Sequence, residues 1–132
     1  MTLVDSNILI DIWTEDPNWF EWSSAEYAKC LSVGVVAINP IIYSELSLGF
    51  PSEAELDSAI YTARIDRIPL PFKAAFSAGR AFLEYRKRGG VKTAPLPDFY
   101  IGAHAQHSGI PLLTRDPSGY QSYFPGLEMI TP

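Results

Sequence analysis

The sequence of 132 residues lacks the features of a secreted or membrane-anchored chain. Its one cysteine, Cys30, has no partner for an internal bridge, which excludes a disulfide-stabilised scaffold. No apolar run approaches the roughly 18 residues that a membrane span requires. The N-terminal stretch has no basic segment and is interrupted by Asp5 and Asp11, so it predicts neither a signal peptide nor an anchor. We therefore expect a cytoplasmic protein with no membrane contact.

Basic residues are scarce, and they are unevenly placed. Lys and Arg number 10 against 15 Asp and Glu, and the net charge is −5. Taken alone, this balance argues against a nucleic-acid-binding protein. However, residues 1–60 hold ten acids and one base, whereas residues 61–92 hold eight bases and two acids. The acidic half is either a solvated surface or a set of carboxylates that holds a divalent cation.

Short apolar runs alternate with amphipathic stretches along the chain. The length and the hydrophobic content of 47% predict one folded domain spanning residues 1–132. Strands are expected at 2–4, 35–38, 67–70, 110–114 and 127–130. Helices are expected between them, with starts near residues 6, 16, 39, 51, 71 and 97 and a short helix around Tyr120. This alternation predicts an α/β sandwich around a mostly parallel sheet of four or five strands, with 67–70 at an edge because of Pro69.

Four carboxylates lie at or near the carboxyl ends of the expected strands. Asp5 directly follows the first strand, and Asp116 follows the strand at 110–114. Asp98 begins a helix, and Glu45 lies on the helix after the strand at 35–38. Ligands bind at this edge of parallel sheets, and clustered carboxylates raise one another's pKa unless a cation is bound. Oxygen ligands favour Mg²⁺ or Mn²⁺, which suits metal-assisted phosphodiester hydrolysis.

Each of these residues also has a structural interpretation. Asp5 and Asp98 occupy positions where aspartate commonly caps a helix or lies in its first turn. Asp116, which precedes Pro117, could begin a turn, and Glu45 could be a solvated helix residue. The combined placement of the four favours the functional interpretation over any single position.

Four segments distributed along the chain carry a family resemblance. They read LVDSNILID at the start, IYSEL near the middle, LPDFYIGAHA later, and LLTRDPSGYQSYFPGLEMI at the end. With these motifs the sequence resembles PIN-domain ribonucleases, and in particular the VapC-like toxins of type II toxin–antitoxin modules, over essentially its whole length. The resemblance implies a PIN-like α/β/α sandwich and Mg²⁺- or Mn²⁺-dependent endonucleolytic cleavage of RNA.

The resemblance also implies roles for individual residues. By motif position it implies four catalytic and metal-binding carboxylates: Asp5, Glu45, Asp98 and Asp116. Asn7 and Thr114 match polar positions that help to hold the ion or its water. Arg115 is placed to touch a phosphate group, whereas Asp11, one helical turn after Asn7, is interpreted as structural.

Two further stretches are candidate contact surfaces. Arg86, Arg88 and Lys92, beside Gly89-Gly90, could follow an RNA backbone or could simply solvate a helix end. Trp13 and the aromatic residues at 19–22 either pack the first helices on the sheet or form a groove for a partner. The resemblance implies that this partner is a cognate antitoxin bound near the active site, and that the chain forms a homodimer.

Several functions therefore compete. The first is a metal-dependent ribonuclease toxin, and the second is a PIN-like RNA-processing nuclease without an antitoxin. The third is a catalytically inactive module that binds nucleic acid or protein. An aspartate-nucleophile phosphotransferase fits less well, because it would need Asp-x-Asp after the first strand, where this chain has Asp5-Ser6-Asn7.

Overall fold

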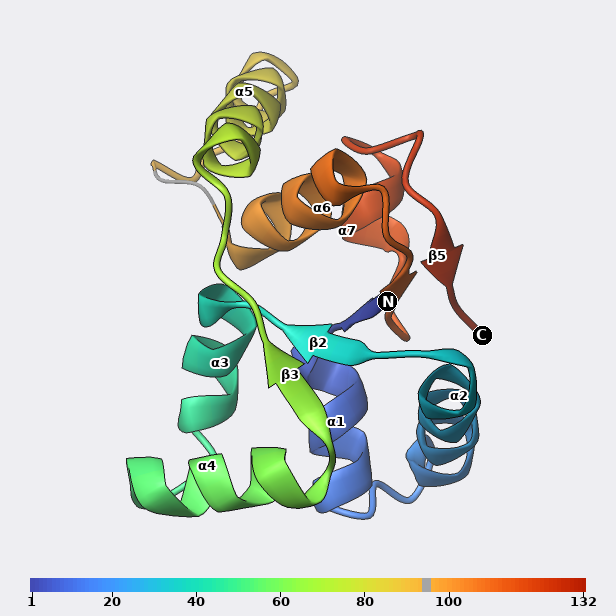
Figure 1. The fold of residues 1–132 in the computed structure, drawn as a ribbon. Coiled ribbons are helices and arrows are strands. Elements are labelled where there is room, and N and C mark those ends of the chain that lie inside the picture. Colours follow the sequence, from blue (N-terminus) through green and yellow to red (C-terminus); the bar gives the residue numbers. More distant parts are fainter. Residues whose placement is uncertain (94–95) are drawn as a thin grey trace.

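A five-stranded parallel sheet forms the centre of the protein. The structure is a computed structural model, and it describes residues 1–93 and 96–132. The strand order is β3-β2-β1-β4-β5, and every neighbouring pair is parallel (Figure 1). The strands are β1 (Thr2–Val4), β2 (Val36–Ile38), β3 (Ile65–Arg67), β4 (Leu112–Leu113) and β5 (Met129–Ile130). Strands β1 and β2 are buried throughout, as expected for a parallel sheet covered on both faces.

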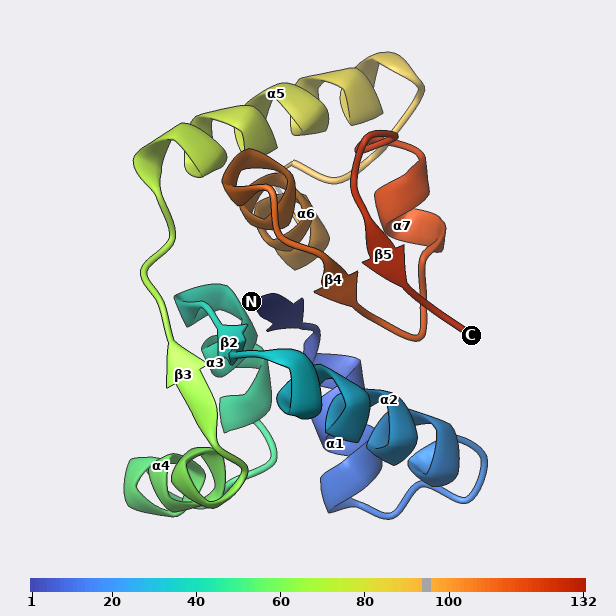
Figure 2. The ribbon, with the colours of Figure 1, turned by 45° about the vertical axis from the view of Figure 1, so that its right-hand side comes forward.

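Helices cover both faces of this sheet. They are α1 (Ser6–Trp13), α2 (Phe20–Val33), α3 (Pro40–Ser47), α4 (Glu53–Thr62), α5 (Phe72–Lys87), α6 (Pro97–Ser108) and α7 (Ser118–Gln121). Helices α1 to α4 lie on one side and α5 to α7 on the other, which confirms the predicted α/β/α sandwich (Figures 1 and 2). Because the chain changes side between β3 and β4, the strand order reverses between β1 and β4. Open α/β sheets bind ligands at such a reversal.

A polar residue defines the start of α3, and a glycine defines the end of α6. Asn39 Oδ1 accepts a hydrogen bond from the Ile42 N–H at 2.9 Å and so caps α3, which begins with Pro40. Helix α6 ends at Gly109, whose φ of 64° lies in the left-handed region. The two helices are also tied together, since Asn39 Nδ2 lies 3.0 Å from Nδ1 of the buried His104. This contact fixes α3 and α6 on either side of the sheet edge.

Four elements differ clearly in extent from the prediction. Strand β3 ends at Arg67 instead of covering 67–70, because Pro69 cannot donate a hydrogen bond to the ladder, although its position at a sheet edge is confirmed. Helix α2 begins at Phe20, since Asp16 Oδ1 accepts two backbone hydrogen bonds at 2.8 and 2.9 Å and forms a turn instead. Strands β4 and β5 are shorter than expected, with two residues each.

The apolar core lies on the two faces of the central strands. Leu3, Val4 and Leu112 are fully buried there, and Ile8 and Ile101 bring α1 and α6 against them. Within the described ranges 1–93 and 96–132, no helix has the length and apolar character needed to cross a membrane.

Candidate active site

Asp5 lies at the carboxyl end of β1, where the strand order reverses. Its side chain is 4% exposed, and Oδ2 accepts hydrogen bonds from Tyr120 OH at 2.8 Å, Thr114 Oγ1 at 2.9 Å and Asn7 Nδ2 at 3.4 Å. Asp5 occupies the N-cap position of α1, as its structural interpretation predicts, but among the described residues its side chain makes no capping hydrogen bond to that helix. All three side-chain donors are neutral, and the carboxylate is therefore buried without a countercharge.

Asp98 reaches the same place from the first turn of α6. Its Oδ1 lies 3.3 Å from the hydroxyl group of Tyr120, which thus stands between two carboxylates. A phenol has one proton, so Tyr120 can donate to only one of the two carboxylates at a time. The pair is consequently short of hydrogen-bond donors, which is a situation that a bound cation would relieve.

Glu45 approaches from α3 and completes a group of three interacting carboxylates. Its Oε1 accepts a hydrogen bond from Ser6 Oγ at 3.1 Å, and the side chain is partly buried. Burial raises the pKa of Glu45, and the charges of Asp5 and Asp98 raise it further. Glu45 is therefore not the solvated helix residue that the alternative interpretation describes.

Asp116 lies close to this group but faces the start of α7. Its Oδ1 accepts hydrogen bonds from Ser118 Oγ at 2.8 Å and from the Ser118 N–H at 3.4 Å, as a turn residue does. Its negative charge nevertheless raises the pKa values of Asp5 and Asp98. The structure thus brings three of the four predicted carboxylates together, and it places the fourth within electrostatic reach with its Oδ1 engaged by Ser118.

The negative charges of the four carboxylates are not balanced by a nearby positive charge among the described residues. Burial is the main cause that raises the pKa of Asp5, and hydrogen bonds from Tyr120 and Thr114 oppose it. Removal from water, followed by the charge of Asp5, raises the pKa of Asp98. No Lys or Arg of residues 1–93 and 96–132 forms an ion pair with any of the four carboxylates.

The donor set fits a hard divalent cation by its chemistry. Carboxylate oxygens without cysteine or histidine are the ligands preferred by Mg²⁺ and Mn²⁺. As the side chains stand, however, no three His, Cys, Asp or Glu residues in the described part of the chain lie close enough together to hold an ion. The carboxylates therefore form an open acidic edge and not a closed cage. Such an edge suits Mg²⁺, which keeps several of its waters.

Tyr120 and Ser6 are the site residues that the sequence analysis missed. Tyr120 is 1% exposed, and a buried tyrosine hydroxyl group usually has a polar partner. The available signal was its spacing, since Tyr120 follows Asp116 by about one helical turn. Ser6 was assigned only to a helix start, yet its hydroxyl group orients Glu45.

Two of the predicted supporting residues contact the acidic edge and one does not. Asn7 and Thr114 form a small network on Asp5, because Asn7 Nδ2 also donates to Thr114 Oγ1 at 3.2 Å. Arg115 instead directs its guanidinium group to Asp11, with Nε 2.7 Å from Oδ2, and stacks on the ring of Trp19 at 5.6 Å. Arg115 is therefore held by the structure at a different carboxylate from those of the acidic edge.

The candidate substrate-binding bases lie where α5 meets the α7 segment. Arg88 donates from Nη1 to the Ser122 carbonyl oxygen at 3.1 Å and stacks on the Tyr123 ring at 4.9 Å. Arg86 donates to the carbonyl oxygen of Lys92 at 2.6 Å. The contacts of Arg88 anchor the basic end of α5 on the same segment that carries Tyr120.

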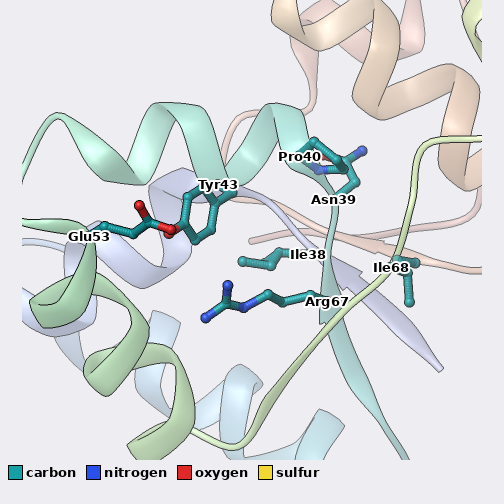
Figure 3. Close-up of a pocket in the computed structure, with 7 residues that line it drawn as sticks. All are labelled: Ile38, Asn39, Pro40, Tyr43, Glu53, Arg67 and Ile68. Carbon is teal, nitrogen blue, oxygen red and sulfur yellow. The ribbon is translucent and has the colours of Figure 1, made fainter.

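A separate hollow lies at the carboxyl ends of β2 and β3, with a volume of about 220 Å³. Figure 3 shows Tyr43, Glu53 and the guanidinium group of Arg67 around it, from α3, α4 and β3. Its arginine is paired, because Asp57 accepts from Tyr43 OH and forms an ion pair with Arg67, both at 2.7 Å. This hollow therefore contains a cation that is balanced by a carboxylate, unlike the acidic edge.

Comparison with known families agrees with this architecture. A model of the PIN domain matches residues 2–122. The chain belongs to the PIN domain family. No match to the sequence is found among curated proteins.

Several solved structures share the fold of this PIN domain. A chain of the crystal structure of VapBC2 from Rickettsia felis, bound to a DNA fragment from their promoter, has a TM-score of 0.71 and 20% identity, covering 99% of this chain and 98% of that one. VapBC-1 from nontypeable Haemophilus influenzae gives 0.71 and 19%, covering 98% and 96%. A toxin–antitoxin complex from Klebsiella pneumoniae gives 0.67 and 24%, covering 100% and 98%.

Proposed function

We propose that this chain is a Mg²⁺- or Mn²⁺-dependent endoribonuclease that acts as the toxin of a toxin–antitoxin module. The observation that carries the proposal is the meeting of Asp5, Glu45 and Asp98 at one sheet edge with raised pKa values and no basic partner among the described residues. Membership of the PIN domain family supports nuclease chemistry. The full-length likeness to chains of VapBC complexes supports the toxin role.

The chemistry follows from the donor set. The residues that would hold the ion are Asp5, Glu45, Asp98 and Asp116. When bound, such an ion supplies Lewis acidity, which lowers the pKa of a bound water and neutralises charge on a phosphodiester. Thr114 and Asn7 keep Asp5 in one orientation, and Ser6 does the same for Glu45. The basic residues near 86–92 would bind the RNA backbone.

End-labelled RNA provides the direct test. The wild-type protein should cut it in MnCl₂ or MgCl₂ and should stop cutting when EDTA is added. Asp98→Asn should retain its fold, measured by circular dichroism, and lose this cleavage. Cleavage that survives EDTA would overturn metal dependence, and an absence of cleavage with every divalent ion tested would favour the inactive binding module.

An apolar groove beside the acidic edge supports an antitoxin partner. It lies between α1 and α3, has a volume of about 630 Å³, and is lined by Ile10, Trp13, Glu45, Leu48 and Phe50 among others. Leu48 is 89% exposed, and the rings of Trp13 and Phe50 form an edge contact at 5.4 Å. A segment with apolar anchors and a cationic residue would match these side chains and reach Glu45.

Binding of a cognate antitoxin can be tested by co-purification with the product of a small neighbouring reading frame. The complex should form with the wild-type protein and should inhibit its RNA cleavage, and Leu48→Glu should weaken both effects. If no such frame exists and the protein cuts RNA alone, the RNA-processing nuclease becomes the better description.

A homodimer is also part of the proposal. Helix α5 exposes Phe72 by 93%, Phe76 by 63% and Leu83 by 47% along one stripe, and large apolar surfaces of this kind are often interfaces. Sedimentation equilibrium should give twice the monomer mass of 14.6 kDa, and Phe76→Ser should lower it.

A further inference from the structure

Tyr120 joins two of the proposed metal-binding carboxylates although it carries no charge itself. We propose that Tyr120 is a positioning residue of the acidic site, whose hydroxyl group holds Asp98 beside Asp5 before the ion binds. This inference rests on the proposed function, because it takes both carboxylates as ligands of a divalent cation. It concerns the arrangement of the site before the ion arrives.

The hydrogen bonds of the two carboxylates are unequal, and this gives Tyr120 its role. Asp5 has support besides Tyr120, since Thr114 Oγ1 donates to it at 2.9 Å. Asp98 has the Tyr120 hydroxyl at 3.3 Å, and no other side chain of residues 1–93 and 96–132 donates to it. Removal of this hydroxyl group should therefore free Asp98 while Asp5 stays in place.

Two glycines allow the phenol to reach this position. A Cβ atom on Gly102 of α6 would lie 2.5 Å from the ring of Phe124 and 3.1 Å from that of Tyr120. A Cβ atom on Gly119 would lie 3.1 Å from Asp98 Oδ2. A side chain at Gly102 would fit only if these two rings moved, so the segment that carries Tyr120 is packed closely against α6. Tyr120 is consequently held rigidly, as a positioning group must be.

The same contacts decide which oxygen of Asp5 is available to an ion. The three side-chain donors all meet at Oδ2, and no side chain of the described residues donates to Oδ1. A carboxylate that is held by one oxygen keeps the other for a cation. Tyr120 thereby orients Asp5 when its proton points there, and it retains Asp98 when its proton turns to that carboxylate.

The test is Tyr120→Phe, which removes the hydroxyl group and keeps the ring. Titration with MnCl₂ alone in a calorimeter should show a dissociation constant about threefold to tenfold larger than that of the wild-type protein, the range expected for one hydrogen bond. The Mn²⁺ concentration for half-maximal cleavage should rise by the same factor as the dissociation constant.

Tyr27→Phe is the matched control. Tyr27 on α2 also loses a hydrogen bond in this variant, because its hydroxyl group donates to the Ala63 carbonyl oxygen at 2.6 Å. It lies outside the acidic site, so its variant should lose stability without a change in Mn²⁺ affinity. An equal loss of affinity in both variants would show a general effect of stability and would overturn the positioning role.

Crystal structures of the metal-free proteins separate this inference from the proposed function. Asp98 should adopt one conformer in the wild-type protein and several in Tyr120→Phe. Equal order of Asp98 in both, or unchanged Mn²⁺ affinity, would overturn the role of Tyr120. A wild-type protein that binds no Mn²⁺ would overturn the metal site, and the two crystal structures would then decide the inference on their own.

Discussion

Asp5 and Asp11 are two buried aspartates at either end of α1, and their surroundings differ in charge. Asp11 is 1% exposed and lies 2.7 Å from Arg115 Nε and 2.9 Å from Ser23 Oγ. Asp5 is 4% exposed, and the side chains that donate to it are neutral. A buried charge that only maintains the fold is paired, whereas one left unpaired beside other carboxylates lowers stability. That cost is typical of a site kept for a ligand.

Arg115 makes the contrast clear. It lies next in sequence to Asp116, so its cation could have neutralised the acidic edge. Its guanidinium group is instead fixed between Asp11 and the ring of Trp19. The fold therefore keeps a positive charge away from the three interacting carboxylates and uses it where a single aspartate is buried.

The largest expected effect is on RNA cleavage, which should depend on Asp5 and not on Asp11. Asp5→Asn should lower RNA cleavage by roughly 10²–10³-fold, the range for loss of one preorganised group that stabilises charge. Asp11→Asn should leave the rate per folded molecule nearly unchanged. Single-turnover cleavage at saturating Mn²⁺ measures both variants. Equal losses in the two would remove the distinction between a functional and a structural aspartate.

The next effect concerns stability, for which we expect Asp11 to matter more than Asp5. Asp11→Asn leaves Arg115 without its partner, although this arginine, 32% exposed, can still reach water. We expect a loss of about 2 kcal/mol in the free energy of unfolding, less than for a fully buried pair. Urea denaturation of the metal-free protein measures it. Asn7→Ala, at the other end of the helix, should cost less, whereas a negligible loss in Asp11→Asn would show that the ion pair contributes little.

The fold was largely predictable because its signals are local. Continuous apolar runs define the buried strands, and residues such as Asn39 and Gly109 mark helix ends through bonds within a few positions. Where the prediction was wrong, a competing local interaction decided. The side chain of Asp16 forms a turn in place of the first turn of α2, and Pro69 ends β3 early.

The site was less predictable, because side-chain directions depend on distant partners. The positions of Asp5 and Asp98 follow from strand and helix ends. The direction of Arg115 depends on Asp11, which is 104 positions away in sequence, and the role of Tyr120 depends on Asp5, which is 115 positions away. Spacing in the sequence alone predicts neither the Arg115–Asp11 contact nor the Tyr120–Asp5 contact. Asp116 shows the same limit, since its turn with Ser118 engages Oδ1, which would otherwise be available to the acidic edge.

A smaller effect concerns the pH dependence of stability. The pKa of Asp5 is raised above its ordinary value of 3.8, so the folded protein binds a proton there more tightly than the unfolded chain does. This contribution is complete below the ordinary value and is lost as the pH rises through the raised one. Metal-free Asp5→Asn should therefore be more stable than the wild-type protein near neutral pH, and this gain should shrink in acid. Parallel stability curves from urea denaturation at several pH values would contradict the raised pKa.

The smallest effect tests whether the basic residues at the end of α5 bind the RNA substrate or only solvate the end of the helix. Lys92→Ala should raise KM for RNA by about threefold and reduce the slope of log affinity against log salt by about 0.7, as expected for one contact with a single strand, with kcat unchanged. Lys29→Ala is the control, because Lys29 is an exposed lysine of the acidic half, paired with Glu26 at 2.6 Å. Its removal should leave the slope as it is. If both variants alter the slope equally, the RNA responds to net charge alone, and the uneven placement of bases along the chain has no part in substrate binding.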